Sequence, residues 1–213
     1  THSTYSDGTL TPAQLIALAQ ELHLEAIALC DHNTVAGLPE FLAAAEECGV
    51  EAIPGIEFST DYGETELHIL ALFVEPAHYA AVTAKVEEML VRKEASNLAL
   101  IGSLDRAGIS LDYAAIKAAT PNGQVNRAVI AAEMVRLGYC TSVKEAFRLW
   151  LAPERGHFQP PKRLDACETI RFIRSIGAVS VLAHPFLNLE EKSLREFLAQ
   201  AVGCGLDGME TIY

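Results

Sequence analysis

Imidazole and carboxylate side chains recur along this chain at the ends of strand-like apolar segments, where a turn residue would be the ordinary choice. Asp31-His32 directly follows one apolar run, and the apolar runs before Glu57 and His184 end in the same way. Further groups of this kind are His2, Ser6-Asp7-Gly8 and His68.

Neutral imidazole and carboxylate suit Mn²⁺, Zn²⁺ or Fe²⁺, and a carboxylate such as that of Glu57 can bridge two ions. Two neighbouring ions polarise a phosphoryl oxygen, generate hydroxide near neutral pH and stabilise the leaving oxygen. The residue types therefore predict a multi-metal hydrolytic site of the kind that cleaves phosphate esters.

Alternating helix and strand patterns indicate which elements position these side chains. Thr11-Pro12-Ala13-Gln14 is a capping box with proline at the first helical position, and it predicts a helix of about 12 residues. The continuous apolar run Ala26–Leu29 predicts a strand buried on both faces. The remaining elements expected in this part of the chain are a helix over 38–48 and strands over 51–56 and 66–73. After residue 162 the alternation resumes with helices over 165–176 and 189–204 and strands over 178–183 and 206–213.

This alternation predicts an α/β fold of parallel βαβ units. Active sites of such folds lie at the carboxyl ends of the strands. His32, Glu57 and His184 each follow a predicted strand, so one edge of the sheet should collect them. His68 fits less well, because it lies near the start of its apolar run.

Residues 77–161 carry helical patterns only and are expected to form an all-helical insertion into the α/β frame of residues 1–76 and 162–213. Because the insertion follows the His68 strand, we expect it to cap the strand carboxyl ends and wall the metal pocket. Arg127 and Arg155 are the candidates for binding a substrate phosphate, since a guanidinium fits a phosphate bidentately, and they rank above Lys162. The alternative for each is an ordinary solvated surface charge.

A single histidine or acidic residue usually has a structural role or lies on the surface. Only the surrounding motifs favour metal binding for the candidates above. Asp7 before Gly8 could be a simple turn. Asp31 could orient an imidazole rather than bind an ion. Glu210, on the last predicted strand, could lie near the site. The histidines without a motif around them are His23, His78 and His157.

The order of the motifs resembles that of the PHP (polymerase and histidinol phosphatase) family, in particular its stand-alone phosphoesterases. The resemblance spans the whole chain and rests on His2, Ser6-Asp7-Gly8, Asp31-His32, Gly55-Ile56-Glu57, His68 and Ala183-His184-Pro185. It implies a distorted (β/α)7 barrel with two or three divalent ions. By this resemblance His2 serves the first ion and Glu57 bridges it to the second. His68 and His184 complete the second site, and Asp7 and His32 hold the third. The catalytic residues implied are Asp7, His32 and Glu57.

Departures from the family pattern keep a second interpretation open. The first His of His-x-His should precede Thr1, and an Asp-x-His should follow Tyr213, so we expect material to be missing at both ends. Cys30 stands where relatives have Thr, and the insertion reads Arg127-Ala128-Val129 where they often have Arg-x-His. If the missing ligands are real losses, the chain is a non-catalytic binding module with a decayed metal site.

Composition limits the class of substrate and partner. The net charge of −12 and a pI near 5 argue against binding of duplex nucleic acid and favour a small phosphorylated substrate. Nucleoside phosphates or the 5′ ends of short RNA are the first expectation from the resemblance, and histidinol phosphate is the alternative. No apolar stretch approaches the roughly 20 residues of a membrane helix. The five cysteines are scattered without CxxC spacing, which predicts a reducing cytoplasm and no disulfide framework.

Overall fold

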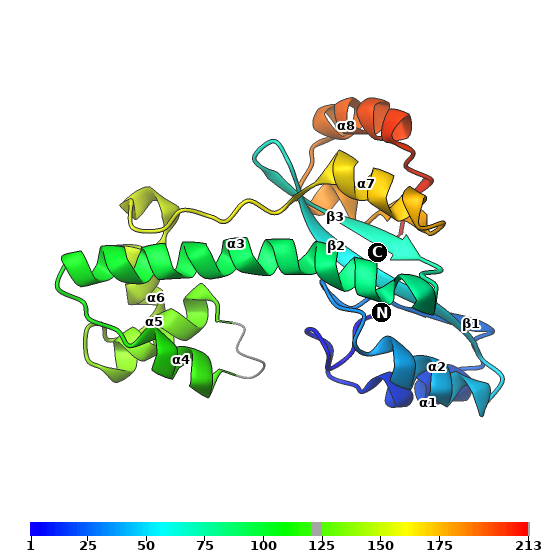
Figure 1. Ribbon diagram of the computed structural model, residues 1–213, viewed down its shortest axis with the longest axis horizontal. Helices are drawn as coiled ribbons and strands as arrows, with labels where there is room; N and C mark the ends of the chain where they lie inside the picture. Colours follow the sequence, from blue (N-terminus) through cyan, green and yellow to red (C-terminus); the bar gives the residue numbers. More distant parts are fainter. Residues whose placement is uncertain (121–124, 213) are drawn as a thin grey trace. The chain divides into compact units, whose positions relative to one another are not determined.

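The computed structural model describes residues 1–120 and 125–212 of the chain (Figure 1). Its contacts divide the chain into two compact units. The first unit comprises Thr1–Glu87 and Arg163–Tyr213, and the second comprises Glu88–Lys162. None of the described helices is long and apolar enough to cross a lipid bilayer.

The first unit is an α/β structure built on one mixed sheet. Its strands are β1 (Ala26–Leu29), β2 (Glu51–Tyr62), β3 (Thr65–Leu72), β4 (Leu164–Asp165), β5 (Val179–Leu182) and β6 (Gly208–Met209). Its helices are α1 (Pro12–Glu21), α2 (Leu38–Glu46), η1 (Pro76–His78), the start of α3 (Tyr79–Arg106), α7 (Ala166–Ser175), η5 (Pro185–Leu187) and α8 (Glu191–Cys204). The predicted capping box of α1 is confirmed, because the Thr11 side chain accepts from the Gln14 backbone N–H and the Gln14 side chain returns the bond.

The sheet has the order β1-β2-β3-β5-β6, with β4 beside β2. Its strands all run in one direction except β3, which is antiparallel to both β2 and β5. The described strands form an open sheet, so the expected (β/α)7 barrel is not confirmed and the expectation of purely parallel pairing is wrong.

A tight hairpin explains the reversed strand. The sequence pattern ended one strand at residue 56, but β2 continues to Tyr62 and only Gly63 and Glu64 separate it from β3. A two-residue loop can join only antiparallel strands, since a parallel crossover needs a dozen or more residues. Gly63 has a φ of +62°, as a glycine at the first position of such a loop often has.

The reversal accounts for the position of His68 and removes one argument about the insertion. Because β3 is antiparallel, its start lies at the same end of the sheet as the carboxyl ends of its neighbours. His68, in the first half of β3, therefore lies on the same side as the other candidate ligands. The end of β3 lies at the opposite edge, where Leu72 pairs with Gly55. The direction of β3 thus gives no reason for the helical insertion to cap the site, and the cap remains a prediction.

Helices cover the sheet and bury its apolar side chains. Helix α7 packs on β2, β3 and β5, while α1 packs on α2 and β1. The largest fully buried side chains of this unit include Phe41 on α2, Phe58 on β2 and Phe197 on α8. This packing makes β2 and β3 rigid supports for the polar side chains on their other face.

All elements described for the second unit are helical. They are the remainder of α3, α4 (Tyr113–Ala119), α5 (Arg127–Arg136), α6 (Val143–Ala146), the π-helical turn η3 (Phe147–Leu151) and η4 (Pro153–Arg155). The unit has a hydrophobic core of its own, with Leu100, Leu104, Ile130 and Met134 fully buried. Helices α5 and α6 both begin at a side-chain cap, Asn126 for α5 and Ser142 for α6.

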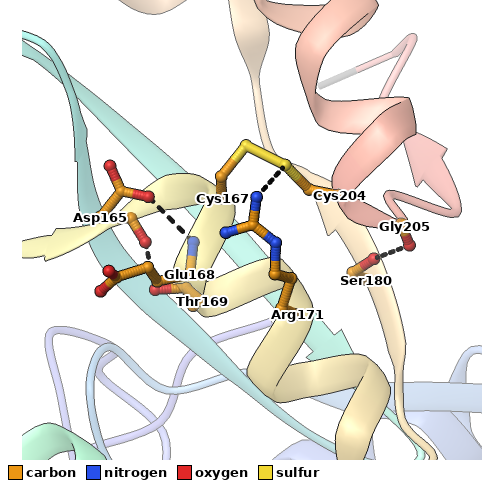
Figure 2. The surroundings of a disulfide bond; sticks show 8 residues. All are labelled: Asp165, Cys167, Glu168, Thr169, Arg171, Ser180, Cys204 and Gly205. Carbon is orange, nitrogen blue, oxygen red and sulfur yellow. Dashed lines mark hydrogen bonds between the residues drawn. A yellow bond between two sulfur atoms is a disulfide. The ribbon is translucent and has the colours of Figure 1, made fainter.

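A disulfide joins α7 to α8, and the prediction that the cysteines form none is wrong. Cys167 lies in the first turn of α7 and Cys204 is the last residue of α8, with their Cα atoms 5.6 Å apart (Figure 2). Arg171 donates to the Cys204 sulfur at 3.4 Å. A sequence separation of 37 residues gives no local signal of pairing, so only the packing of the two helices reveals it.

We expect the disulfide to stabilise the first unit by about 2–4 kcal/mol, because it closes a loop in the unfolded chain. A reductant should therefore lower the urea midpoint of the parent protein but not that of Cys204→Ala. Cys48→Ala is the matched control, since Cys48 is a free cysteine and this variant should respond to reductant as the parent does. Equal midpoints of the oxidised and reduced parent would contradict the expectation.

Candidate metal centre

Glu57 is the central residue of the site, and this residue is only 3% exposed. It lies on β2, and its backbone is fixed on the β1 side, where its N–H donates to the Asp31 carbonyl at 3.2 Å and its carbonyl accepts from the Asn33 N–H at 2.9 Å. The sheet therefore continues beyond β1 through a bridge between His32 and Glu57. A buried carboxylate must be matched by hydrogen bonds or opposite charge.

The two oxygens of Glu57 face two different pairs of histidines. Oε2 lies 3.2 Å from Nε2 of His2 and 3.9 Å from Nδ1 of His32. Oε1 lies 2.7 Å from Nδ1 of His68 and 3.0 Å from Nε2 of His184. Within each group of three the donor atoms are within 4.8 Å of one another, so the described residues contain two candidate metal groups that share one carboxylate.

The histidines come from four separate segments, which the sheet brings to one edge. His32 follows β1, His68 lies in the first half of β3, and His184 follows β5. The rings of His2 and His32 are stacked, with centroids 4.5 Å apart. His184 has a φ of +28°, and its backbone N–H donates to Oε2 of Glu210 at 2.7 Å. Strained backbone of this kind is held in place by its surroundings and is concentrated at functional sites.

Asp7 lies at the exposed rim of this centre. Its Oδ1 is 3.8 Å from Nδ1 of His2 and its Oδ2 is 3.6 Å from Nε2 of His32, and its side chain is 67% exposed. Asp7 therefore faces the group of His2 and His32 from the solvent side, on the side away from Glu57.

Asp31 orders the N-terminal loop that carries His2 and Asp7. It is buried and accepts bonds of 2.6 Å from the Ser3 N–H, the Ser3 hydroxyl and the Ser6 hydroxyl. The interpretation of Asp31 as the partner of an imidazole is therefore replaced by one in which it fixes the loop through serine hydroxyls. The same loop requires glycine at position 8, because a Cβ there would clash with the His2 carbonyl.

The electrostatics of the centre follow from the shared carboxylate. Burial would raise the pKa of Glu57, but hydrogen bonds from His2 and His68 outweigh it and hold that pKa well below its usual range. Burial likewise would lower the pKa of His68, but the carboxylates of Glu57 and Glu66 raise it to about 9. The hydrogen bond to Glu57 raises the pKa of His2, whereas burial lowers that of His32.

The donor set fits divalent metal ions. All donors are imidazole nitrogens and carboxylate oxygens, a combination that suits Mn²⁺, Zn²⁺ or Fe²⁺. In addition, Nδ1 of His2 is buried and has no hydrogen-bond partner within the described chain. A buried polar atom of this kind is expected to have a partner, and a metal ion bound nearby could supply it.

The structure places the other candidates as follows. Arg127 and Arg155 belong to the second unit. The Arg127 guanidinium lies 4.1 Å from the ring centroid of Phe158 and donates to the Leu151 carbonyl, whereas Arg155 is exposed at the end of η4. The contact of Glu210 with His184 confirms that Glu210 lies near the site. His23, His78 and His157 are outside both metal groups.

Sequence reasoning missed Glu66, which contacts Nε2 of His68 at 3.3 Å. Strand alternation could have indicated it, because residues two apart on a strand share a face.

Comparisons with known proteins agree with this geometry. Residues 1–144 match the model of the PHP domain. The chain is 33% identical over 210 residues to a 5′-3′ exoribonuclease of Haemophilus influenzae, covering 98% of this chain and 76% of that protein. It is 28% identical over 185 residues to a 3′,5′-nucleoside bisphosphate phosphatase of Chromobacterium violaceum, covering 86% of this chain and 65% of the relative. The fold is similar to the crystal structure of a protein from Bifidobacterium adolescentis assigned as a metal-dependent phosphoesterase, with a TM-score of 0.70, 25% identity, and coverage of 98% and 74%. Because its sequence matches the family model and its site holds a buried carboxylate facing four histidines, the chain belongs to the PHP family of metal-dependent phosphoesterases.

Proposed function

We propose that the protein hydrolyses phosphate esters of nucleotides, either a phosphomonoester of a nucleoside phosphate or the terminal diester at the 5′ end of a short RNA. The proposal rests on the geometry of Glu57, whose two carboxylate oxygens each face a different pair of histidines. A carboxylate shared in this way is suited to hold two cations side by side, and two-metal sites use this arrangement to stabilise the attacking and leaving oxygens of a phosphoryl transfer.

The chain's residues have distinct roles in this proposal. His2 and Glu57 would hold one ion and Glu57, His68 and His184 a second, while Asp7 with His32 would hold a third. Bound divalent ions supply charge stabilisation for the phosphate and make a coordinated water acidic. Asp7 faces solvent beside His32, so its carboxylate can orient a water molecule or take up its proton. Glu57 and Asp31 hold the imidazoles and the N-terminal loop in place.

The choice of substrate rests on the relatives and on charge. The relatives named above act, by their names, on RNA from its 5′ end and on nucleoside bisphosphates. Both substrates have a phosphate next to a nucleoside, and both are smaller targets than a duplex, which an acidic chain is poorly suited to bind. Histidinol phosphate remains the second candidate substrate.

A substrate panel tests the proposal. The protein, loaded with Mn²⁺, should release phosphate from nucleoside 3′,5′-bisphosphates or mononucleotides from short 5′-phosphorylated RNA, and should leave duplex RNA intact. Release from histidinol phosphate alone would favour the second candidate. Tight metal binding with no hydrolysis of any phosphate ester would favour a non-catalytic binding module.

The helical unit is proposed to supply substrate contacts rather than metal ligands. We expect Arg155→Ala to raise KM about 10-fold, because a charge-assisted hydrogen bond to the substrate phosphate is lost, and to leave the metal content unchanged. Arg127→Ala should weaken substrate binding in the same way. Since Arg127 also stacks on Phe158, Arg127→Lys is needed to separate lost binding from lost stability.

Arg148→Ala is the matched control, because Arg148 lies in the same unit, is exposed and pairs only loosely with Glu145, at 3.6 Å. Unchanged steady-state constants in Arg127→Ala and Arg155→Ala would show that the helical unit contributes no phosphate contact through these residues.

A further inference from the structure

Glu66 places a second carboxylate against the metal centre, next to the ring of His68. The burial pattern of β3 alternates, with Leu67, Ile69 and Ala71 buried in the core. Glu66 and His68 therefore share the opposite face, and the Glu66 carboxylate reaches the imidazole directly. The contact is made through Oε1 of Glu66, 3.3 Å from Nε2 of His68.

The two ring nitrogens of His68 thus face two different environments. Nδ1 lies 2.7 Å from Oε1 of Glu57 and 3.2 Å from Nε2 of His184, within the second candidate metal group. Nε2 faces the carboxylate of Glu66. A histidine that binds a metal through one nitrogen commonly donates its other N–H to a carboxylate, which fixes the tautomer and the ring orientation.

Glu66 is itself held firmly from two sides. Its Oε2 accepts from Nη2 of Arg163 at 2.6 Å, and its backbone carbonyl accepts from the side-chain amide of Asn188 at 3.0 Å. Arg163 is fixed in turn by Asp61, whose carboxylate accepts from Nη1 at 3.1 Å and from the Arg163 N–H at 2.8 Å. Asp61 lies directly opposite Glu66 in the β2–β3 register. The guanidinium therefore clamps two carboxylates on paired strands.

We infer that Glu66, clamped by Arg163, is a positioning residue that holds His68 as the Nε2–H tautomer with its Nδ1 lone pair directed at the second metal group. The inference rests on the proposed metal site and adds the residue that prepares one of its ligands. Glu66 accepts the Nε2–H bond and does not bind an ion itself. Arg163 limits the carboxylate to this orientation, since its two terminal nitrogens bind Glu66 and Asp61 separately.

Metal binding to variants of Glu66 tests the inference. Zn²⁺ binding is measured by competition with a chromophoric chelator, for the parent, Glu66→Ala, Glu66→Gln and Arg163→Ala. We expect Glu66→Ala to weaken one ion-binding step about 10- to 100-fold and to leave the step that depends on His2 and His32 unchanged. Glu66→Gln keeps an acceptor oxygen and should lose less affinity, and Arg163→Ala should show a smaller loss at the same step. Glu64→Ala is the matched control, because Glu64 is an exposed carboxylate in the adjoining hairpin loop, away from His68.

A second measurement reports on the tautomer directly. Nitrogen-15 NMR of histidine-labelled, Zn²⁺-loaded protein should show His68 as the Nε2–H tautomer in the parent and in Glu64→Ala. Parent-like affinity for every ion in Glu66→Ala, with an unchanged His68 signal, would overturn the inference and leave the proposed function intact. Failure of the parent itself to bind divalent ions would overturn both.

Discussion

Replacing Glu57 with glutamine is expected to reduce phosphoesterase activity by at least about 100-fold. Loss of a residue that only supports a metal ligand already lowers metal affinity or activity by about 10- to 100-fold, and Glu57 is proposed to bind the ions directly. Each oxygen of Glu57 faces its own pair of histidines, so the amide of the variant would present a nitrogen to one of the two groups. His2→Ala should cost less activity, since it removes a donor from one group and leaves the shared carboxylate in place. Activity assays with metal analysis of each purified variant would check this order.

The matched control for Glu57→Gln is Glu51→Gln, which changes an exposed carboxylate on the same strand. It should retain the activity and metal content of the parent. If Glu57→Gln contained as much metal as the parent, the idea that Glu57 bridges two ions would fail.

Removal of the metal ions should abolish hydrolysis and also lower the stability of the folded protein. Ions that bind only the native state at about 100 times their dissociation constant stabilise it by about 2.7 kcal/mol. For a chain of this size that corresponds to a rise in Tm of roughly 5 to 10 °C. Dialysis against a chelator, followed by thermal unfolding and activity assays before and after addition of Mn²⁺, would measure both effects.

The same experiment on Glu57→Gln provides the control for metal removal. Because the shared carboxylate is lost, the chelator and Mn²⁺ should shift its Tm much less than that of the parent. A parent protein whose activity survives exhaustive chelation would rule out the metal-dependent mechanism proposed above.

Much of the candidate site could be predicted from local sequence because ligand chemistry belongs to the residue type. The sequence places Glu57 and His184 at the ends of apolar runs and His68 near the start of one. The structure brings the three within hydrogen-bonding distance, although Glu57 and His184 are 127 positions apart. The α1 capping box was predictable for the same reason, since Thr11 and Gln14 are only three residues apart and bond each other.

Strand direction could not be predicted from hydrophobic patterning. A run of apolar residues has the same appearance in a parallel and an antiparallel strand, so β3 was expected to run with its neighbours. The two-residue loop at Gly63 forces the reversal, and this reversal places His68 at the edge of the site. The topology depended on where β2 ends, and the ends of strands are what hydrophobic periodicity predicts least well.

The sequence by itself determined the identity and order of the candidate metal-binding side chains, the α/β character of the frame and the helical patterning of residues 77–161. Only the tertiary structure decided which partners these side chains have: Asp31 binds the Ser3 and Ser6 hydroxyls, Glu66 contacts His68, and Cys167 joins Cys204. The physical reason is the range of the interactions. Coordination chemistry and helix caps depend on residues that are close in sequence or on the residue alone, whereas pairings across tens of residues form only when packing of the apolar core brings distant segments together.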